Sequence, residues 1–235
     1  MATQLVTHYF DEVASTQSEA RQLAEQSSDM AQLVVAQAQT AGRGRVGNTW
    51  LTAPRALACS LAVHPPWDVG SWGTIPLAAG LAALSALLAV SDVAPALKWP
   101  NDLVTADGKV GGILVEGSGD LAVIGLGINL WWPEPPEGAA ATGDSDPGPE
   151  HAKDVAAAWA TSLLATLDGD PQDWGLADYK VVCVTLGADV TWQPSGSGRA
   201  VDIGSDGALI VDTGTGLTTL RSGEVHTVRS ATITP

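Results

Sequence analysis

Residues 39–50 read QTAGRGRVGNTW, with three glycines and two arginines in twelve residues. The stretch holds Arg43 and Arg45, in a chain with 11 Lys and Arg among 235 residues. Its residues 42–47 match G-x-G-x-x-G, a pattern that in dinucleotide-binding folds follows a strand and opens a helix. An apolar strand precedes it (33–38), but residues 48–55 contain Trp50 and Pro54 and have no helical period. The sequence predicts a loop between strands whose arginines bind an anion, with a solvated surface hairpin as the alternative.

Length, composition and net charge limit the class of protein to which this chain can belong. A length of 235 residues suggests one large or two small domains, and 45% hydrophobic with 16% charged residues is an ordinary globular balance. The formal net charge of −15 argues against a general nucleic-acid or anionic-membrane binder. The first ten residues, MATQLVTHYF, do not resemble a signal peptide. Cys59 and Cys183 lie in apolar runs, which favours reduced thiols in a cytoplasmic protein.

Apolar periodicity predicts an α/β catalytic part. We expect helices at 16–26, 74–90, 152–167 and 173–182, and strands at 33–38, 56–63, 97–99, 109–116 and 121–128, the last two forming a hairpin. Thr16 and Glu19 have the spacing of a capping box, which predicts the start of the first helix. The Ala-rich stretch 75–90 is interrupted by Gly80 and Ser85, so we expect a buried helix and not a membrane span.

The composition changes after residue 132. Residues 133–150 are rich in proline and acids and have no apolar period, so we expect a mobile loop. From residue 187 onward, five short β-type runs (189–192, 199–203, 209–212, 217–220 and 224–228) alternate with Gly, Ser and Asp turns. That spacing predicts a small all-β barrel. We place the boundary near 185, which gives domains 1–185 and 186–235.

Three further motifs carry polar groups. Residues 98–102 read KWPND, and Pro100 ends the strand so that Asn101 and Asp102 lie at its end, where open sheets place ligand contacts. Residues 108–116 read GKVGGILVE, in which Lys109 can stabilise developing negative charge and the paired glycines admit a ligand. Residues 125–130 read GLGINL. Taken singly, the KWPND motif is equally explained by an ordinary turn after Pro100, and Lys109 by an exposed hairpin lysine.

In this order, and with Ser15-Thr16-Gln17 before them, the motifs resemble the biotin protein ligases. That family reads S-T-N/Q, Q-x-A-G-R-G-R-x-G-R-x-W, K-W-P-N-D, K-x-x-G-I-L-x-E and G-x-G-I-N, and the resemblance extends over the whole chain. It implies a mixed-sheet α/β (α+β) catalytic domain related to the class II aminoacyl-tRNA synthetases, with a C-terminal SH3-like β-barrel. It also implies a biotin–[acetyl-CoA-carboxylase] ligase. Biotin and ATP, with Mg²⁺, form biotinyl-5′-AMP and pyrophosphate, and a lysine of a biotin carboxyl carrier domain then takes the biotinyl group.

The resemblance also implies roles for single residues. The catalytic cations would be Lys109, Arg43 and Arg45. Biotin would contact Ser15, Thr16, Gln17, Gln39, Gly42, Arg43, Trp50, Lys109 and Gly112. The nucleotide would contact Arg43, Arg45, Asn101, Asp102, Asn129 and, from the barrel, Arg229. It leaves open the metal ligands, the residue that packs on adenine, and whether the protein is a monomer or a homodimer.

This chain departs from the family pattern at two positions. Asn48 stands where the family has a basic residue, which predicts a looser hold on the phosphate, and Gln17 replaces the commoner Asn. Because the motifs begin at residue 15, we expect no DNA-binding domain and no nucleic-acid or membrane role. The alternatives are a lipoate–protein ligase with a more apolar pocket, and a non-catalytic biotin- or adenylate-binding protein, which the retained Arg43, Arg45 and Lys109 argue against.

Overall fold

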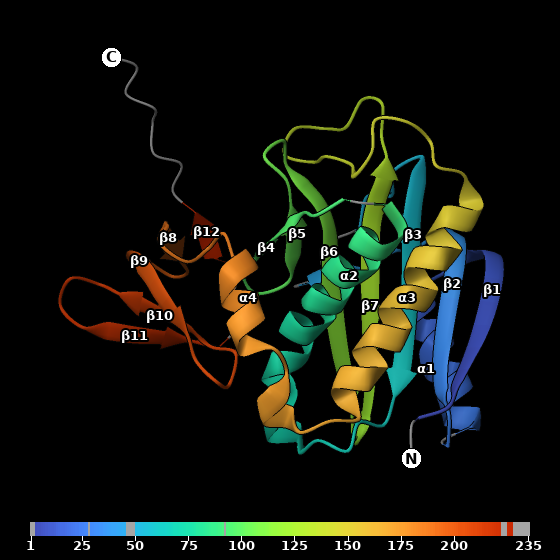
Figure 1. Cartoon of the computed structure of the whole chain (residues 1–235), viewed down its shortest axis with the longest axis horizontal. Coiled ribbons are helices and arrows are strands. Elements are labelled where there is room, and N and C mark those ends of the chain that lie inside the picture. Colours follow the sequence, from blue (N-terminus) through green and yellow to red (C-terminus); the bar gives the residue numbers. More distant parts are fainter. Residues whose placement is uncertain (1–2, 28, 46–49, 92, 222–224, 228–235) are drawn as a thin grey trace.

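A computed structural model describes residues 3–27, 29–45, 50–91, 93–221 and 225–227 (Figure 1). Two sequence-based expectations, those for Asn48 and Arg229, lie outside the described residues. The described chain forms a seven-stranded mixed sheet flanked by helices and a smaller five-stranded sheet at one end. The mixed α/β fold is therefore confirmed.

The large sheet has the strand order β1-β2-β3-β7-β6-β5-β4. Only β1 and β2 pair in parallel; every other neighbouring pair is antiparallel. The parallel pair requires a crossover, which helix α1 (Thr16–Gln26) supplies. The strands are β1 (Leu5–Val13), β2 (Ala31–Gln39), β3 (Arg55–Val63), β4 (Ala96–Lys98), β5 (Asp102–Val104), β6 (Lys109–Ser118) and β7 (Leu121–Trp131). The predicted β6–β7 hairpin is confirmed.

Helices α2 (Ile75–Ser91) and α3 (Pro149–Leu167) pack together on one face of this sheet, and α1 packs on the other (Figure 1). The short 3₁₀ helix η2 (Val69–Thr74) leads into α2. Together, Val69–Ser91 are long and apolar enough to span a membrane. However, most of α2 is buried against the sheet and α3, and the indole of Trp159 donates to the Ala79 carbonyl across the helix pair (3.1 Å). The predicted buried helix is confirmed.

The second sheet is antiparallel, with the order β11-β10-β9-β8-β12, and is consistent with the predicted SH3-like unit. Its strands are β8 (Asp189–Trp192), β9 (Gly196–Ile203), β10 (Leu209–Asp212), β11 (Leu217–Leu220) and β12 (Val225–Thr227). The 3₁₀ helix η3 (Pro171–Asp173) and helix α4 (Leu176–Val182) connect the sheets. All five predicted β runs correspond to strands.

The two sheets share one hydrophobic core. Trp99, which follows β4, is buried, and its indole nitrogen donates to the Gly207 carbonyl of the second sheet (2.9 Å). Thr185, at the predicted boundary, is itself buried and accepts a hydrogen bond from the Trp99 backbone (2.9 Å). The division into domains 1–185 and 186–235 stays a prediction. In the structure, the hydrophobic packing continues across residue 185 from one sheet to the other.

The predicted capping box is wrong. Helix α1 begins at Thr16 with Ser15 as its N-cap, and no side chain of the cap bonds the helix. Instead, the Gln39 side-chain oxygen accepts from both the Thr16 backbone nitrogen (2.8 Å) and the Thr16 hydroxyl (3.0 Å). A long-range partner from β2 therefore satisfies the first free N–H of the helix, which a local pattern could not reveal.

The loop predicted at 133–150 is confirmed up to residue 148, but its middle is hydrogen-bonded to the sheet, which the expectation of a mobile loop did not include. The backbone nitrogen of Lys109 donates to Gly138 O, and that of Ala140 donates back to Lys109 O, both at 2.9 Å. Ala140 is buried, and its carbonyl accepts from the Asn129 side chain (3.0 Å). Hydrogen bonds to backbone groups hold this segment although its own side chains are small and polar.

Arg55 and Asp146 fasten the far end of this segment to β3. The Arg55 guanidinium donates two hydrogen bonds to the Asp146 carboxylate (2.7 and 2.9 Å), and these bonds lower the pKa of Asp146 to about 2. An unpaired aspartate titrates at about 4. The pair therefore stabilises the folded loop fully above about pH 4 and loses that contribution as the pH falls through about 2.

An NMR titration tests this pair. We expect the Asp146 carboxyl to titrate near 2 in the wild type, and to move up towards about 4 once Arg55→Gln removes the guanidinium donor, with the Gly148 N–H as its remaining donor. A wild-type midpoint that already lies near 4 and does not move in the variant would contradict the pairing.

Candidate active site

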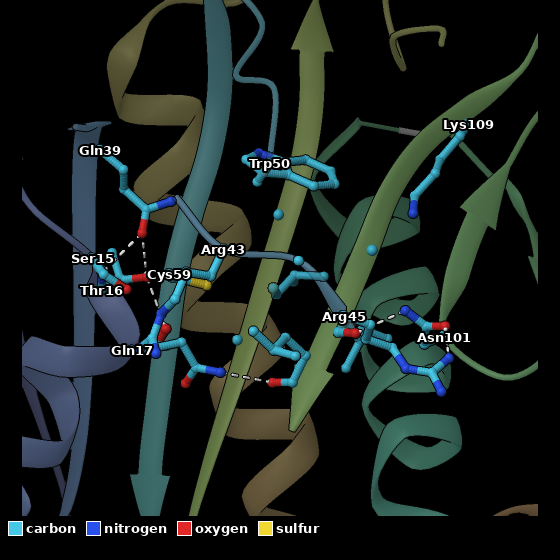
Figure 2. A pocket seen from close by; sticks show the side chains of 18 residues that line it. Ser15, Thr16, Gln17, Gln39, Arg43, Arg45, Trp50, Cys59, Asn101 and Lys109 are labelled. Carbon is cyan, nitrogen blue, oxygen red and sulfur yellow. Dashed lines mark hydrogen bonds between the residues drawn. The ribbon is translucent and has the colours of Figure 1, made fainter. Parts of the chain in front are cut away.

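A pocket of about 500 Å³ opens on the α1 face of the large sheet. It is lined by residues of α1, β3, β6 and β7 and of the 40–50 loop (Figure 2). Ten of the residues predicted from sequence meet there, namely Ser15, Thr16, Gln17, Gln39, Arg43, Arg45, Trp50, Asn101, Lys109 and Gly112. Sequence reasoning missed Ser60 and the floor residues Gly125 and Gly127.

Glycines form the floor of the pocket. Gly112 of β6 lies opposite Gly127 of β7 in the antiparallel register. A Cβ atom at Gly127 would lie 2.8 Å from the Trp50 ring, and one at Gly112 would lie 3.3 Å from the Lys109 side chain. The bare backbone thus lets Trp50 and Lys109 lie directly on the sheet. The signal for this floor was the glycine on every second residue of the GLGINL motif.

A β-bulge turns Lys109 toward the pocket. Side chains alternate between faces along a strand, so Lys109 and Gly112, three residues apart, should point to opposite faces. However, Leu103 pairs with Gly111 and the next residue, Val104, pairs with Lys109, so β6 contains one extra residue. The bulge brings the Lys109 side chain onto the face of Gly112, where a Cβ would meet it.

One end of the pocket is lined mainly by neutral polar side chains. Gln39 holds Thr16, as described above, and the Ser60 hydroxyl donates to the Thr16 hydroxyl (2.8 Å). The Gln17 amide nitrogen donates to the Leu114 carbonyl (3.0 Å). Two buried atoms, Ser15 Oγ and Gln17 Oε1, have no partner within the described part of the chain. Unpaired buried polar atoms are costly, so this end is suited to a ligand that carries both donors and acceptors.

The other end of the pocket is cationic (Figure 2). Lys109 Nζ lies 2.6 Å from the Asp102 carboxylate and 5.8 Å from the centre of the Trp50 ring. The Arg45 guanidinium donates to Asn101 Oδ1 (2.7 Å), and the Asn101 amide in turn donates to a backbone carbonyl of β6. The KWPND motif thereby orients both cations that stand at this end.

Arg43 points away from Arg45. Its guanidinium donates to the Ser18 hydroxyl on α1 (3.1 Å) and lies 3.4 Å from the Glu116 carboxylate. Glu116 also pairs with Arg21 of α1 (3.1 Å). The two arginines of the glycine-rich loop are thus held on different sides of the pocket, and joint binding of one anion requires Arg43 to leave these partners.

Three predicted residues lie outside this pocket. Gly42 forms the base of the loop, where its carbonyl accepts from the Trp50 backbone nitrogen (3.2 Å). Asp102 lines a neighbouring cavity. Asn129 is buried beside the 133–148 segment, and its amide nitrogen bonds Ala140, so its contact with a nucleotide stays a prediction. The predicted contact of Arg229 lies outside the described residues.

The neighbouring cavity has a volume of about 720 Å³ and meets the first at its cationic end. It shares five residues with the pocket, namely Gly44, Arg45, Trp50, Asn101 and Lys109. Its own contributions include Lys98, Asp102 and His226. Two connected cavities with shared cations can hold two substrates that meet at Lys109.

The described residues contain no group of three or more His, Cys, Asp or Glu that could hold a metal ion by themselves. Mg²⁺ is commonly bound by one or two carboxylates together with substrate phosphates, and Asp102 in the second cavity could serve as such a carboxylate. The described residues could therefore hold Mg²⁺ only together with oxygen ligands from a bound phosphate compound.

Cys59 contributes to the pocket wall, and its thiol is buried. Burial raises the pKa of Cys59 far above its ordinary value, so the thiol stays protonated. We expect iodoacetamide at pH 8 to leave Cys59 unmodified in the native protein and to alkylate it in urea, as measured by peptide mass spectrometry. Rapid alkylation of the native protein would show that the wall is open at this point.

Comparison with known proteins agrees with this geometry. Residues 9–129 match the sequence model of the Biotin/lipoate A/B protein ligase family, and the chain belongs to that family. The chain is 34% identical over 218 residues to a Biotin--[acetyl-CoA-carboxylase] ligase of Mycobacterium tuberculosis, a match that covers 84% of this chain and 79% of the relative. It is 25% identical to the Bifunctional ligase/repressor BirA of Bacillus spizizenii, over 93% of this chain and 73% of that protein.

Solved structures show the same relationship. The biotin protein ligase of Aquifex aeolicus in complex with biotin and ATP aligns with a TM-score of 0.77 at 28% identity, over 97% of this chain and 99% of that one. The biotin protein ligase of Leishmania major in complex with biotinyl-5-AMP aligns with a TM-score of 0.65 at 27% identity, over 95% and 98%. These likenesses cover both sheets of the present structure.

Proposed function

We propose that this chain is an ATP-dependent biotin ligase that forms biotinyl-5′-AMP and transfers the biotinyl group to a lysine of a biotin carboxyl carrier domain. The observation that carries this proposal is the polarity gradient along the pocket. Unpaired neutral acceptors at one end, Ser15 Oγ and Gln17 Oε1, suit the ureido ring, and the cations at the other end suit the carboxylate. An apolar dithiolane ring, as in lipoate, would leave those buried acceptors unsatisfied.

The reaction requires positive charge and correctly positioned substrates, and it requires no nucleophilic side chain because the substrates supply the nucleophiles. In the first step the biotin carboxylate attacks the α-phosphate of ATP and pyrophosphate leaves. In the second the carrier lysine attacks the acyl carbonyl and AMP leaves. Lys109 and Arg45, which line both cavities, would stabilise the negative charge where the two anions meet. Asp102, paired with Lys109, would face the incoming lysine.

The cellular setting is part of the proposal. Cys59 and Cys183 are both free and buried, in line with a cytoplasmic protein. The net charge of −15 does not suit DNA binding, so we propose a ligase without a nucleic-acid role. The partner would be the carrier domain of a biotin-dependent carboxylase.

A substrate comparison tests the function. The protein is incubated with ATP, Mg²⁺ and either biotin or lipoate, and pyrophosphate release and acyl transfer to the matching apo carrier domain are measured. We expect turnover with biotin and at least about 100-fold less with lipoate, because an apolar ring leaves buried polar groups unpaired. Faster turnover with lipoate than with biotin would show that lipoate is the substrate. Biotin binding without turnover would favour a non-catalytic biotin-binding protein.

A further inference from the structure

Two arginines share the carboxylate of Glu116 beside the neutral end of the pocket. The carboxylate lies 3.1 Å from the Arg21 guanidinium and 3.4 Å from that of Arg43. The Arg43 guanidinium also donates to the Ser18 hydroxyl (3.1 Å). The Arg43 side chain is 45% exposed, so an ion pair at this distance holds it only weakly. Arg43 therefore rests against partners that it can leave.

The fold brings these partners together from two elements. Gly112, Leu114 and Glu116 alternate along β6 and so share one face of the sheet. Gly112 and Leu114 line the pocket, and Glu116 is the next residue on that face. On α1, Ser18 and Arg21 lie on one side of the helix because they are three residues apart. Strand and helix therefore contact the glycine-rich loop just beyond the neutral end of the pocket.

The charges permit Arg43 to move without leaving a carboxylate unpaired. When Arg43 departs, Glu116 keeps Arg21 as its partner. Arg43 is two residues from Arg45 in the loop, so the Cα atoms of the two arginines lie within about 7 Å of each other. Rotation of the Arg43 side chain thus moves its guanidinium from the neutral end toward an anion bound at Arg45 and Lys109.

We propose that Glu116 is a positioning residue that competes with the adenylate phosphate for Arg43 and thereby sets how tightly the adenylate is held. The inference rests on the proposed function. When Arg43 binds the phosphate, it gains charge-assisted hydrogen bonds but loses its contacts with Glu116 and Ser18. The affinity for the adenylate reports the difference between these two states. Removing the Glu116 charge should therefore strengthen adenylate binding, whereas the loss of a merely structural residue would weaken it.

Two substitutions with opposite expected effects test this competition. The probe is biotinol-5′-AMP, which keeps the phosphate but has a CH₂ group in place of the acyl carbonyl and so cannot transfer biotin. For Glu116→Gln we expect the dissociation constant of the probe to fall about two- to fivefold, the scale of one exposed ion pair. Arg21→Met leaves Glu116 with Arg43 as its only cation among the described residues, so the dissociation constant should rise by a similar factor. Isothermal titration calorimetry measures both values.

Glu25→Gln on α1 is the matched control, because Glu25 is exposed and lies outside the pocket. It reports the effect that removing one negative charge has on binding of any anionic ligand. In an Arg43→Met background, Glu116→Gln and Arg21→Met should no longer change the dissociation constant, since the side chain for which Glu116 competes is absent. Circular dichroism checks the folding of each variant. Ser18→Ala removes the other partner of Arg43 and should also strengthen binding, which gives a second test at an exposed position.

Equal dissociation constants for Glu116→Gln and Glu25→Gln would overturn the inference. Weaker binding in Glu116→Gln that persists in the Arg43→Met background would assign Glu116 a structural role instead. A wild type that binds neither biotin nor the probe would remove the proposed function itself.

Discussion

Replacing Lys109 with glutamine will slow adenylate formation by about 100- to 1,000-fold, the cost of removing one preorganised group that faces developing charge. Lys109 stands on the bare glycine floor where both cavities meet, and its only charged partner in the described chain is Asp102. The neutral end of the pocket, which would hold the biotin ring, is untouched by the substitution. The dissociation constant for biotin should therefore change by only a few fold. Stopped-flow adenylation and equilibrium binding measure the two quantities separately.

A double-mutant cycle separates two causes of this loss. Lys109→Gln leaves the Asp102 carboxylate unpaired beside the phosphate, which by itself would repel ATP. If this repulsion dominates, adding Asp102→Asn will restore much of the rate. If the missing cation on the phosphate dominates, as we propose, the double variant will stay as slow as Lys109→Gln. An equal loss of biotin binding and of adenylation in Lys109→Gln would contradict the charge-stabilising role.

Replacing Trp99 with alanine will destabilise the protein by about 3–5 kcal/mol, the usual cost of truncating a buried tryptophan. Trp99 is 1% exposed, and its indole links the large sheet to Gly207 in the turn between β9 and β10. Trp99→Phe keeps most of the packing but leaves the Gly207 carbonyl unpaired, so about 1–3 kcal/mol is expected. Urea unfolding followed by circular dichroism gives both values.

The control for Trp99 is Val181→Ala, because the Val181 side chain is 85% exposed. Its effect should lie within about 0.5 kcal/mol. If the sheets are joined through one core, Trp99→Ala will unfold in a single transition at lower urea. Two separate transitions in the wild type, with Trp99→Ala shifting neither, would contradict the shared core.

Much of the fold could be predicted from sequence because its elements are locally consistent. Helices α1 and α3 have apolar periods, while α2 and the strands of the β6–β7 hairpin are long, mostly apolar runs, and the positions of all these elements agree with the expected ranges. Strands β1 and β5 were not predicted. β1 is a half-buried edge strand with the sequence LVTHYFDEV and shows no clean alternation, and β5 has three residues.

The sequence predicted which residues form the candidate site better than it predicted how their side chains are arranged. The motifs that resembled the biotin protein ligases pointed to ten of the residues around the pocket. The face of Lys109 depends on a bulge opposite β5, and the cap of α1 depends on Gln39, 23 residues away in sequence. Both result from pairing between distant segments, which no local pattern contains. The separation of Arg43 from Arg45 likewise depends on Ser18, Glu116 and Asn101.

The most direct test of the account is to identify the product that the enzyme forms from biotin, ATP and Mg²⁺ before any acceptor is added. The protein is separated from free nucleotide, denatured, and its released ligand analysed by mass spectrometry. We predict biotinyl-5′-AMP, one equivalent of released pyrophosphate, and loss of the adenylate when an apo carrier domain is supplied. Unreacted biotin with intact ATP, or ADP and phosphate as the nucleotide products, would contradict it.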